Sequence, residues 1–331
     1  MRLMRQVAGV QAPEFWARAG ILPALLSPAA AIWGLGATLR QRCAKPTRIG
    51  IPVLCVGNLV AGGAGKTPTA LAFGALLKAH GRAPHFLTRG YGGSLSGPVR
   101  VDPWNHTSAE VGDEALLLAA MAPTWVSHDR VTGAQAAEAA GATAIVMDDG
   151  FQNPKLAKDL SVVVVDGDYG FGNGRLMPAG PLRERIADGI ARAQAVIVIG
   201  EDRHGIAMSL EGKLPVLRAR LEPDASALRL GGRTVLAFAG IARPEKFYET
   251  LRRLGCNVAI TQDFADHHPY TPDEIMALCE SASAFGALPV TTEKDLARFP
   301  AEARGMVETI RVHLAWDDPG AAEAILKPLL G

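Results

Sequence analysis

The chain has 331 residues, of which 48% are hydrophobic and 20% are charged, and its formal net charge at pH 7 is +1. These values are typical of a globular protein; they exclude a disordered chain and give no overall electrostatic attraction to nucleic acid. The length exceeds what one hydrophobic core usually covers, so we expect two domains. The four cysteines have no C-x-x-C spacing, which indicates free thiols in a reducing compartment and no zinc site.

The N-terminal segment, residues 1–48, is basic and apolar, with Glu14 as its one acid. Its cations are Arg2, Arg5, Arg18, Arg40, Arg42, Lys45 and Arg48. The uncharged run 19–39 is long enough to cross a bilayer, but prolines and glycines interrupt it, and it begins too late for a cleaved signal peptide. Trp16 and Trp33 beside the arginines favour helices that lie in the interface of an anionic membrane. A buried helix pair and a true span are the alternatives.

A glycine-rich loop follows the apolar strand expected at 53–56. Strand, glycine loop, Lys-Thr and a helix opened by Pro68 form the arrangement that binds phosphate groups. The glycines let backbone N–H groups approach an anion, and the helix start adds its own N–H groups and dipole. Lys66 can reach the β- and γ-phosphates, and the Thr67 hydroxyl can ligate Mg²⁺. The predicted loop residues are Gly62, Gly63, Ala64, Gly65, Lys66 and Thr67.

One position departs from the general pattern of such loops, which has a glycine five residues before Gly65. This chain has Val60 there. A glycine-rich turn that binds nothing is therefore the alternative, although the G-G-x-G-K-T core lies in the expected strand-to-helix context.

Further apolar runs predict strands with helices between them, at 84–88, 124–127, 144–147, 161–166 and 195–199. Buried strands that alternate with helices predict a mostly parallel sheet covered on both faces, and we place this domain at 49–214. Within it, Asp113 fits the first turn of a helix, where acids are favourable. Local sequence does not separate that role from a functional one.

Two acids, Asp148 and Asp149, end the apolar strand at 144–147. An Asp at the end of a strand downstream of a phosphate loop is the expected partner of Thr67 for Mg²⁺. Adjacent acids point to opposite sides, so we expect one of them to face the metal. The sequence does not say which.

The C-terminal part begins with two apolar runs around a Pro-Asp turn, which predict a two-stranded connector at 215–233. A smaller α/β domain is expected at 234–331, with its last strand at 310–314. In its turn Asp266-His267-His268, an imidazole that transfers a proton or pairs with a carboxylate is favoured over a metal site, because neighbouring residues rarely point one way. An exposed turn histidine is the alternative. Polar strand-end loops in both domains suggest a ligand cleft between them.

Seven motifs, in order along nearly the whole chain, resemble those of the tetraacyldisaccharide 4′-kinase family, the lipid A 4′-kinases of Gram-negative bacteria. They are V-G-N-L-V-A-G-G-A-G-K-T-P (56–68), R-G-Y-G (89–92), V-G-D-E (111–114), D-D-G-F-Q (148–152), P-A-G-P-L-R-E (178–184), F-A-D-H-H (264–268) and T-E-K-D (292–295). The resemblance implies transfer of the γ-phosphoryl group of ATP to the 4′-hydroxyl of a lipid A disaccharide 1-phosphate, at the cytoplasmic face of the inner membrane.

The resemblance also implies roles for individual residues. Asp113 matches the catalytic carboxylate that accepts the sugar hydroxyl proton, and His267 matches the histidine paired with it. Asp148 and Asp149 match the metal-side acids, with Gln152 beside them.

Two other positions of these motifs compare with the family as follows. Arg183 matches an arginine near the phosphates. Asn153 stands where the family more often has histidine, so the resemblance carries no role over to that position and leaves the implied activity unchanged.

Together these features predict an α/β protein with a P-loop NTPase-like, mostly parallel sheet domain, a second, smaller α/β domain and an N-terminal membrane-associated helical segment. Its expected cofactors are ATP and Mg²⁺, and its partners are the lipid substrate and the inner-membrane surface, with no nucleic acid and no obligate protein partner. One alternative is a P-loop ATPase or GTPase that switches a protein partner, since the loop also resembles that of partition-type ATPases. Another is a nucleotide-binding membrane scaffold without catalysis.

Overall fold

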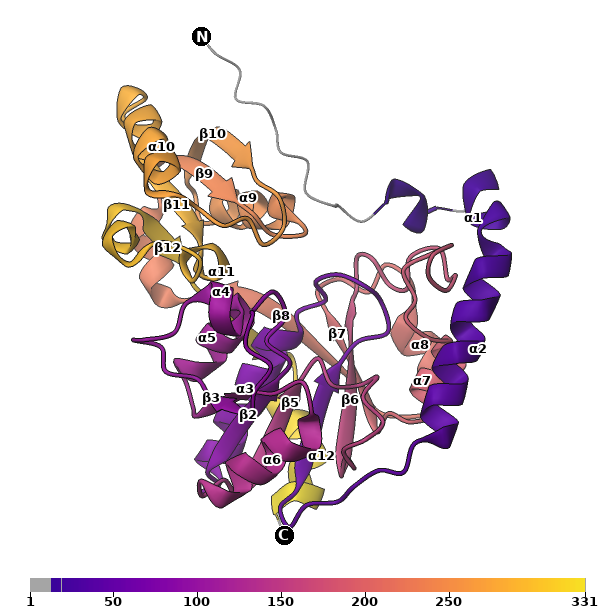
Figure 1. The fold of residues 1–331 in the computed structure, drawn as a ribbon. Helices are drawn as coiled ribbons and strands as arrows, with labels where there is room; N and C mark the ends of the chain where they lie inside the picture. The colour runs from indigo at the N-terminus through magenta and orange to yellow at the C-terminus, as the bar shows by residue number, and fades with distance from the viewer. Residues whose placement is uncertain (1–12, 19, 331) are drawn as a thin grey trace.

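The structure, a computed structural model, describes residues 13–18 and 20–330, so the predictions at Arg2, Arg5 and Ala19 lie outside the described residues. The described chain forms one sheet of nine strands and one of four, each packed against helices. The smaller sheet lies over one end of the larger one, and the N-terminal helices lie along another side (Figure 1). The predicted α/β fold with mostly parallel strands is confirmed.

The larger sheet has the strand order β13-β8-β7-β6-β1-β5-β2-β4-β3. All neighbours pair in parallel except at the two edges, where β3 on β4 and β13 on β8 are antiparallel. The strands are β1 (Val53–Gly57), β2 (Pro84–Thr88), β3 (Val99–Arg100), β4 (Thr124–Val126), β5 (Ala144–Asp148), β6 (Leu160–Asp166), β7 (Ala195–Ile199), β8 (Val216–Pro223) and β13 (Val312–Trp316). Because β1 lies in the middle, its C-terminal end opens where parallel α/β sheets bind ligands.

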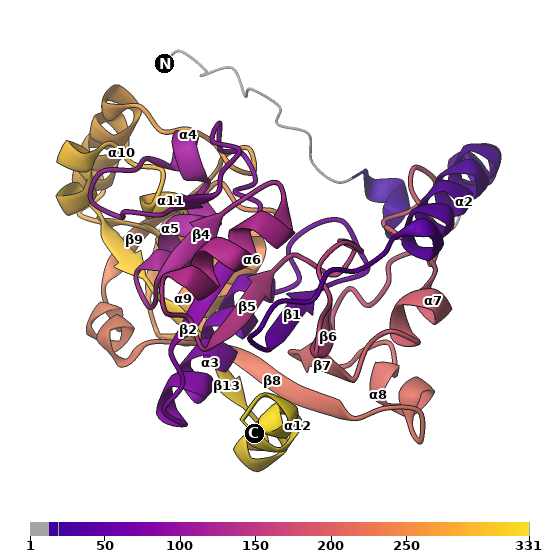
Figure 2. The same ribbon diagram turned by 60° about the horizontal axis from the view of Figure 1, so that its bottom comes forward.

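Helices cover both faces of this sheet, and every residue of β1, β2, β5, β6 and β7 is buried. Burial on both faces explains why these strands are mostly apolar instead of alternating between apolar and polar residues. One face packs against α3 and α12, and the other against α6 and α8 (Figure 2). The helices of this part are α3 (Lys66–Ala79), α4 (Ser108–Val111), α5 (Asp113–Ala119), α6 (Arg130–Ala139), α7 (Ile186–Ile190), α8 (Ile206–Leu210) and α12 (Pro319–Leu330).

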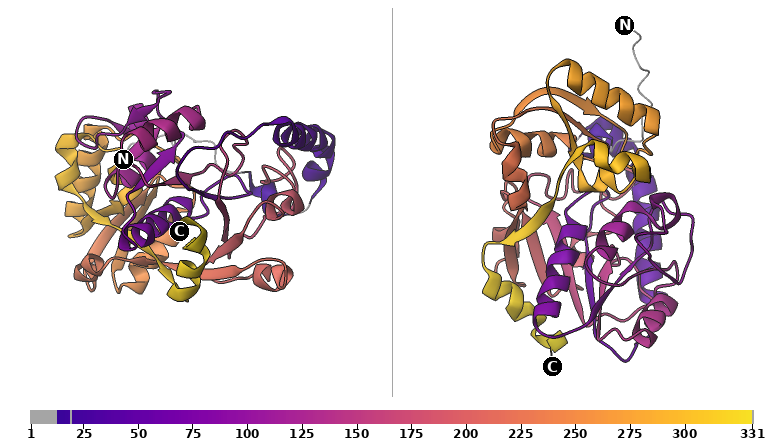
Figure 3. Two further views of the ribbon diagram at one scale, coloured as in Figure 1. Left: turned by 90° about the horizontal axis from the view of Figure 1, so that it is seen from below. Right: turned by 90° about the vertical axis from the view of Figure 1, so that its left-hand side faces the viewer.

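The smaller sheet is wholly parallel, with the order β10-β9-β11-β12. Its core has two sides: Tyr248 and Leu251 of α9 pack on one face, and Ile275 and Leu278 of α10 pack on the other. The view from the side shows this unit stacked on the larger one (Figure 3). Its elements are β9 (Thr234–Ala239), α9 (Pro244–Arg253), β10 (Asn257–Asp263), α10 (Pro272–Ala284), β11 (Leu288–Thr292), α11 (Glu293–Leu296), a 3-10 helix η3 (Ala301–Met306) and β12 (Glu308–Ile310).

The connections between the two sheets differ from the prediction. The strand expected at 227–233 is a 3-10 helix, η2 (Ala225–Leu230), which buries Ala227 and Leu230 at helical spacing. The strand expected at 310–314 is two strands: β12 ends the smaller sheet, and β13 pairs antiparallel with β8 in the larger one. Residues from 312 onward therefore return to the larger sheet, and β8 belongs to that sheet and not to a separate connector.

The N-terminal segment forms a 3-10 helix η1 (Glu14–Trp16) and two helices, α1 (Ile21–Leu25) and α2 (Ser27–Cys43). A buried helix pair is wrong for this segment, because Pro23, Ala30 and Gly34 are its only buried residues among those described in these elements. Large apolar side chains are exposed instead, namely Ile21, Leu22, Leu25, Ile32, Trp33, Leu35 and Leu39. In the part of the chain that the structure describes, no helix combines the length and hydropathy that crossing a bilayer requires.

Candidate active site

The phosphate loop connects β1 to α3 and has the geometry that its glycines require. Gly62 and Gly65 have φ angles of 114° and 85°, a region that side chains with a Cβ rarely adopt. A Cβ on Gly65 would also lie 2.5 Å from Cδ1 of Ile199 at the end of β7. Val60, at the position that departs from the general pattern, is buried and bridges to Leu182. This residue thus fastens the loop to the segment 178–184.

The start of α3 carries the two side chains expected to meet phosphates and metal. The helix begins at Lys66, two residues before the predicted start at Pro68. Lys66 and Thr67 are each 8% exposed, and Ala64 of the loop is buried beside them. The first turn points its unpaired N–H groups and the positive end of its dipole at the same place. The structure therefore brings the predicted loop residues together at the C-terminal edge of the sheet.

The acids Asp148 and Asp149 do point different ways, as the sequence predicts. Asp148 ends β5 and is fully buried; its Oδ2 accepts a 2.8 Å hydrogen bond from the Thr67 hydroxyl. Asp149 has a φ of 50° and receives two hydrogen bonds from Arg183, of 2.7 and 3.3 Å, with the Lys66 ammonium 3.8 Å away. The left-handed backbone at Asp149, unusual for a non-glycine residue, is what turns the second acid toward these cations.

The two acids also differ electrostatically. Burial, with a further contribution from the Glu114 charge, raises the pKa of Asp148 to about 7. Burial acts the same way on Asp149, but the charges of Lys66 and Arg183 outweigh it and hold the pKa of that carboxyl below its usual value. Asp148 is thus the acid with too little positive charge around it.

A divalent cation fits this place. Oδ1 of Asp148 is buried and has no hydrogen-bond partner within the described part of the chain, so one oxygen is free to ligate. Thr67 supplies a second oxygen beside it. The described residues contain no group of three or more His, Cys, Asp or Glu side chains that could hold a metal. One free carboxylate oxygen beside a hydroxyl suits Mg²⁺, which keeps waters and binds through one or two carboxylates together with substrate phosphates.

Gln152 and Arg183 lie in one hydrogen-bond network beside the acids. Gln152 donates to the Asn58 carbonyl at 2.8 Å and to Glu184 at 3.0 Å, and accepts from Arg183 at 3.3 Å. Glu184 in turn pairs with Arg192 at 2.6 Å. Sequence reasoning did not single out Glu184, although it closes the motif at 178–184. The network holds the side chains around the loop in fixed positions.

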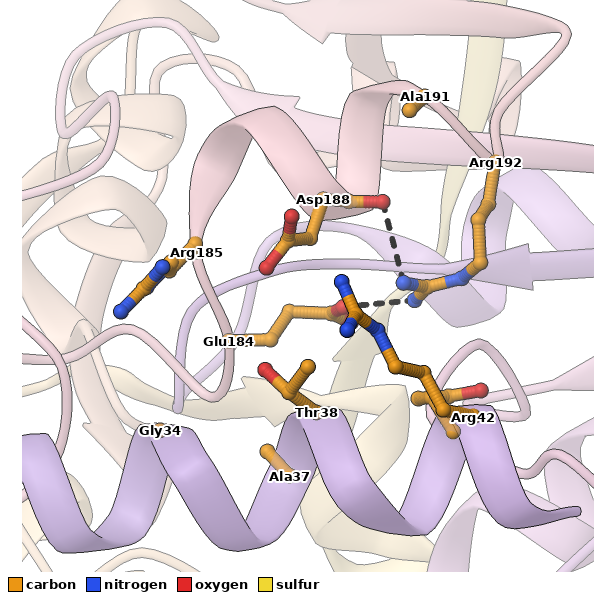
Figure 4. A pocket seen from close by; sticks show the side chains of 10 residues that line it. Gly34, Ala37, Thr38, Arg42, Glu184, Arg185, Asp188, Ala191 and Arg192 are labelled. Carbon is orange, nitrogen blue, oxygen red and sulfur yellow. Dashed lines mark hydrogen bonds and ion pairs between the residues drawn. The ribbon is translucent and has the colours of Figure 1, made fainter.

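Helix α2 is attached to this network. Its Trp33 donates to the Arg183 carbonyl at 3.0 Å, and its Gln41 donates to the Gln152 carbonyl at 3.3 Å. A cavity of about 280 Å³ separates α2 from α7, and Arg42, Glu184 and Arg192 point into it (Figure 4). The exposed N-terminal helix is therefore anchored next to the phosphate loop.

Asp113 and His267 meet across the boundary between the two sheets. Asp113 is the first residue of α5 and is 3% exposed; its Oδ2 lies 3.0 Å from Nδ1 of His267. Its Oδ1 accepts the backbone N–H of Glu114, so it serves the helix start as well. His267 has a φ of 60° in the loop after β10, and its neighbour His268 pairs with Glu274 instead. The two side chains come from different units and are in direct contact.

Two cations complete the surroundings of Asp113, and the sequence did not predict either. Lys294 of α11 lies 4.0 Å from Oδ2, and the buried Arg298 lies 3.4 Å from the same oxygen. Burial alone would raise the pKa of Asp113. The hydrogen bond from His267 and the charges of Lys294, His267 and Arg298 outweigh burial and hold that pKa below its usual value. The carboxylate is therefore ionised at neutral pH and is aimed at the interface between the sheets.

A mostly parallel sheet with a phosphate loop after its central strand, and acids at the end of the neighbouring strand, defines a P-loop nucleotide-binding protein. The family model described as "Tetraacyldisaccharide-1-P 4'-kinase", LpxK, matches residues 22–330 of the chain. The chain belongs to this family, and its activity is that of a kinase of lipid A biosynthesis.

Individual relatives agree with the family match. The chain is 56% identical over 327 residues to the tetraacyldisaccharide 4′-kinase of Rhodospirillum centenum, with 97% of each chain covered. It is 53% identical to that of Rhodospirillum rubrum, covering 97% of this chain and 98% of the relative. The crystal structure of LpxK from Aquifex aeolicus in complex with ATP superposes with a TM-score of 0.74 at 25% identity, over 94% of this chain and 100% of that one.

Proposed function

We propose that the protein transfers the γ-phosphoryl group of ATP to the 4′-hydroxyl of a lipid A disaccharide 1-phosphate at the cytoplasmic face of the inner membrane. The observation that carries this proposal beyond family membership is the 3.0 Å contact between Asp113 and His267. It supplies an ionised carboxylate paired with an imidazole, which is what transfer to an alcohol requires, and the charge of the adjacent Glu114 acts on Asp148 beside Thr67.

The loop residues and Lys66 hold the triphosphate. Backbone N–H groups of Gly62 to Gly65 and the start of α3 face the phosphate oxygens, and Lys66 neutralises charge on the β- and γ-phosphates. Thr67 and Asp148 would hold Mg²⁺, which supplies charge stabilisation to the phosphates when bound. Asp149 serves mainly to hold Arg183 in place, because both of its carboxylate oxygens accept hydrogen bonds from that side chain.

Asp113 is the base in this mechanism. The sugar oxygen attacks the γ-phosphorus as the bond to the β–γ bridging oxygen breaks, and the hydroxyl proton passes to the Asp113 carboxylate. ADP leaves with the pair of electrons from the broken bond. His267 orients the carboxylate through its hydrogen bond to Oδ2. Since Asp113 is 3% exposed, the incoming hydroxyl has to displace one of the groups that surround it.

Helices α1 and α2 place the protein on the membrane that holds the substrate. Ile32, Leu35 and Leu39 lie at spacings of three and four residues and are exposed, so they share one apolar face of α2. Arg40 and Arg42 in its last turn suit an anionic lipid surface. The bonds from Trp33 and Gln41 to the site then bring a sugar at the membrane surface close to the phosphate loop.

The direct test is incubation with labelled ATP and purified lipid A disaccharide 1-phosphate, followed by mapping of the new phosphate. We expect label at the 4′-position and no transfer without the lipid. Hydrolysis of ATP without the lipid, at the same rate with and without Asp113, would support the nucleotide-switch alternative instead.

A further inference from the structure

Lys294 contacts both members of the Asp113–His267 pair, and nothing in the proposed mechanism uses it. Its ammonium lies 3.5 Å from Nε2 of His267, 3.5 Å from Oε1 of Glu114 and 4.0 Å from Oδ2 of Asp113. Burial disfavours its charge, but Asp113, Glu114 and Asp266 outweigh that effect and raise its pKa above the usual value. Lys294 therefore remains an ammonium group at neutral pH.

The position of this ammonium acts together with the Asp113 carboxylate on which nitrogen of His267 carries the proton. An ammonium has three donors and no acceptor, so the Nε2 atom that faces it must present a lone pair. In the neutral imidazole the proton is then on Nδ1, which faces the Asp113 carboxylate. We propose that Lys294 is a positioning residue that holds His267 in its Nδ1-protonated tautomer and so keeps the hydrogen bond directed at Asp113.

An acid competes for the same nitrogen, which makes the role of Lys294 specific. Oδ1 of Asp266 lies 3.8 Å from Nε2 of His267, slightly farther than the ammonium. An acid at that place favours a proton on Nε2. Without Lys294, the Nε2-protonated tautomer gains, and this form would turn a lone pair toward Asp113.

Arg298 fixes the backbone that carries these side chains. Its guanidinium donates to the carbonyls of Lys294, His268 and Gly240, at 3.2, 3.2 and 3.0 Å, and is 8% exposed. It thereby holds α11 against the loop in which His267 adopts its left-handed backbone. The ammonium and the imidazole keep their separation because both of their segments are held by this one side chain.

All charged and aromatic groups around the pair enter the expected pH behaviour. They come from the His267 loop, from α5, from α11 and the residues after it, and from the loop after β2; they are Asp266, Glu114, Lys294, Asp295, Arg298 and Tyr91. Of these, Lys294 is the cation that touches both partners. Its removal withdraws a positive charge from Asp113 and leaves Asp266 facing His267 without a competitor.

The first measurement is the tautomer itself, read from ¹⁵N shifts of the imidazole nitrogens in the full chain. We expect the Nδ1-protonated form for His267 in the wild type and in Lys294→Arg, and a gain of the Nε2-protonated form in Lys294→Met. Lys246→Met is the matched control, because Lys246 also makes ion pairs between the two units, with Asp166 and Asp168, but does not contact the pair. Unchanged signals of the other histidines verify folding, and an unchanged His267 tautomer in Lys294→Met would overturn the proposal.

The second measurement rests on the proposed function, because it takes Asp113 as the base. In Lys294→Met we expect kcat to fall about 10- to 100-fold with KM for ATP nearly unchanged, and the acid limb of kcat/KM to move up by about one pH unit. The Lys294→Arg variant should keep most of the wild-type kcat and most of the wild-type pH profile of kcat/KM. An unmoved acid limb argues against the proposal. Failure of the proposed function would instead appear as full activity in Asp113→Asn, and the tautomer result stands apart from that outcome.

Discussion

The phosphate loop is assembled by one sheet, whereas the Asp113–His267 pair is assembled by two. The residues of the first site lie at the ends of β1 and β5, which are neighbours in the larger sheet; they are the phosphate loop, Lys66, Thr67 and Asp148. Asp113 and His267 are 154 residues apart and come from different sheets. The first site depends on the folding of one sheet, and the second depends on how two units pack.

The two regions also differ in the charges that surround their buried acids. Asp148 is buried with an unpartnered oxygen and a raised pKa, so it lacks a positive charge that a cation can supply. Asp113 is equally buried but has an imidazole, an ammonium and a guanidinium around it, and a lowered pKa. In the mechanism that we propose, this contrast suits the first acid to the metal and the second to proton transfer, although both are aspartates at element ends.

The largest expected effect is at the phosphate loop. Lys66→Ala should lower kcat/KM by about 10³-fold or more and weaken ATP binding by about tenfold, because a buried cation directed at the phosphates is lost. Initial rates and ATP titration measure the two effects. If this variant bound ATP with nearly wild-type affinity, the phosphate loop would not differ from the Asp113–His267 pair as the region that binds ATP.

Asp113→Asn should lower kcat by about 10²- to 10⁴-fold, the usual contribution of a general base. ATP affinity should stay within about twofold of the wild type, since Asp113 lies outside the loop and binding there is separate from proton transfer. A loss of ATP affinity as large as that in Lys66→Ala would show that Asp113 is a metal or structural residue.

Asp148→Asn should lower activity sharply and yet stabilise the metal-free protein. Because the folded-state pKa of Asp148 is raised, its contribution to stability is complete below its unfolded value of about 4 and is lost as the pH rises through about 7. At pH 8 in EDTA the variant should therefore melt several degrees higher than the wild type. Mg²⁺ should raise Tm in the wild type and not in the variant. A lower Tm for the variant than for the wild type in EDTA would contradict the inference that the Asp148 carboxylate lacks positive charge around it.

The smallest effect is expected away from both regions, on the exposed face of α1 and α2. The double variant Leu25→Glu/Ile32→Glu should reduce co-sedimentation with anionic vesicles several-fold, because two side chains that are 72% and 75% exposed lose their apolar character. Leu228→Glu is the matched control, since Leu228 is 69% exposed on η2. Equal vesicle binding by all three proteins would reject the interfacial role of the N-terminal helices.

Much of the larger sheet could be predicted from the sequence. The strands expected at 84–88 and 195–199 agree residue for residue with β2 and β7, because buried parallel strands are rich in apolar residues and are followed by polar residues or glycine. The two errors, at 227–233 and 310–314, fall where the chain passes between the sheets. Short apolar runs there carry no information about their pairing partners, which lie elsewhere in the sequence.

The candidate site divides in the same manner. Glycines, Lys66 and the paired acids have a local signature because one loop and one strand end create the site. Lys294 lies in a motif that resembles the family's, but its distance to His267 is set by tertiary packing. Arg298 carries no such signal: α11 ends at Leu296, and only the structure shows that its guanidinium reaches Asp113. Lys294 and Arg298, which act through contacts between two units, were missed, and so was Glu184 inside the larger unit.

The return of β13 to the larger sheet makes the smaller unit an insertion between two adjacent strands. Pro223 and Val312 are register partners, and the next residues, Asp224 and Arg311, share a backbone hydrogen bond of 3.0 Å. The points of departure and return are therefore about 5 Å apart, close enough for a tight turn to join them. Excising 224–311 would leave a self-contained nucleotide-binding unit with its terminal helix in place, and would remove His267 and its supporting cations in one step.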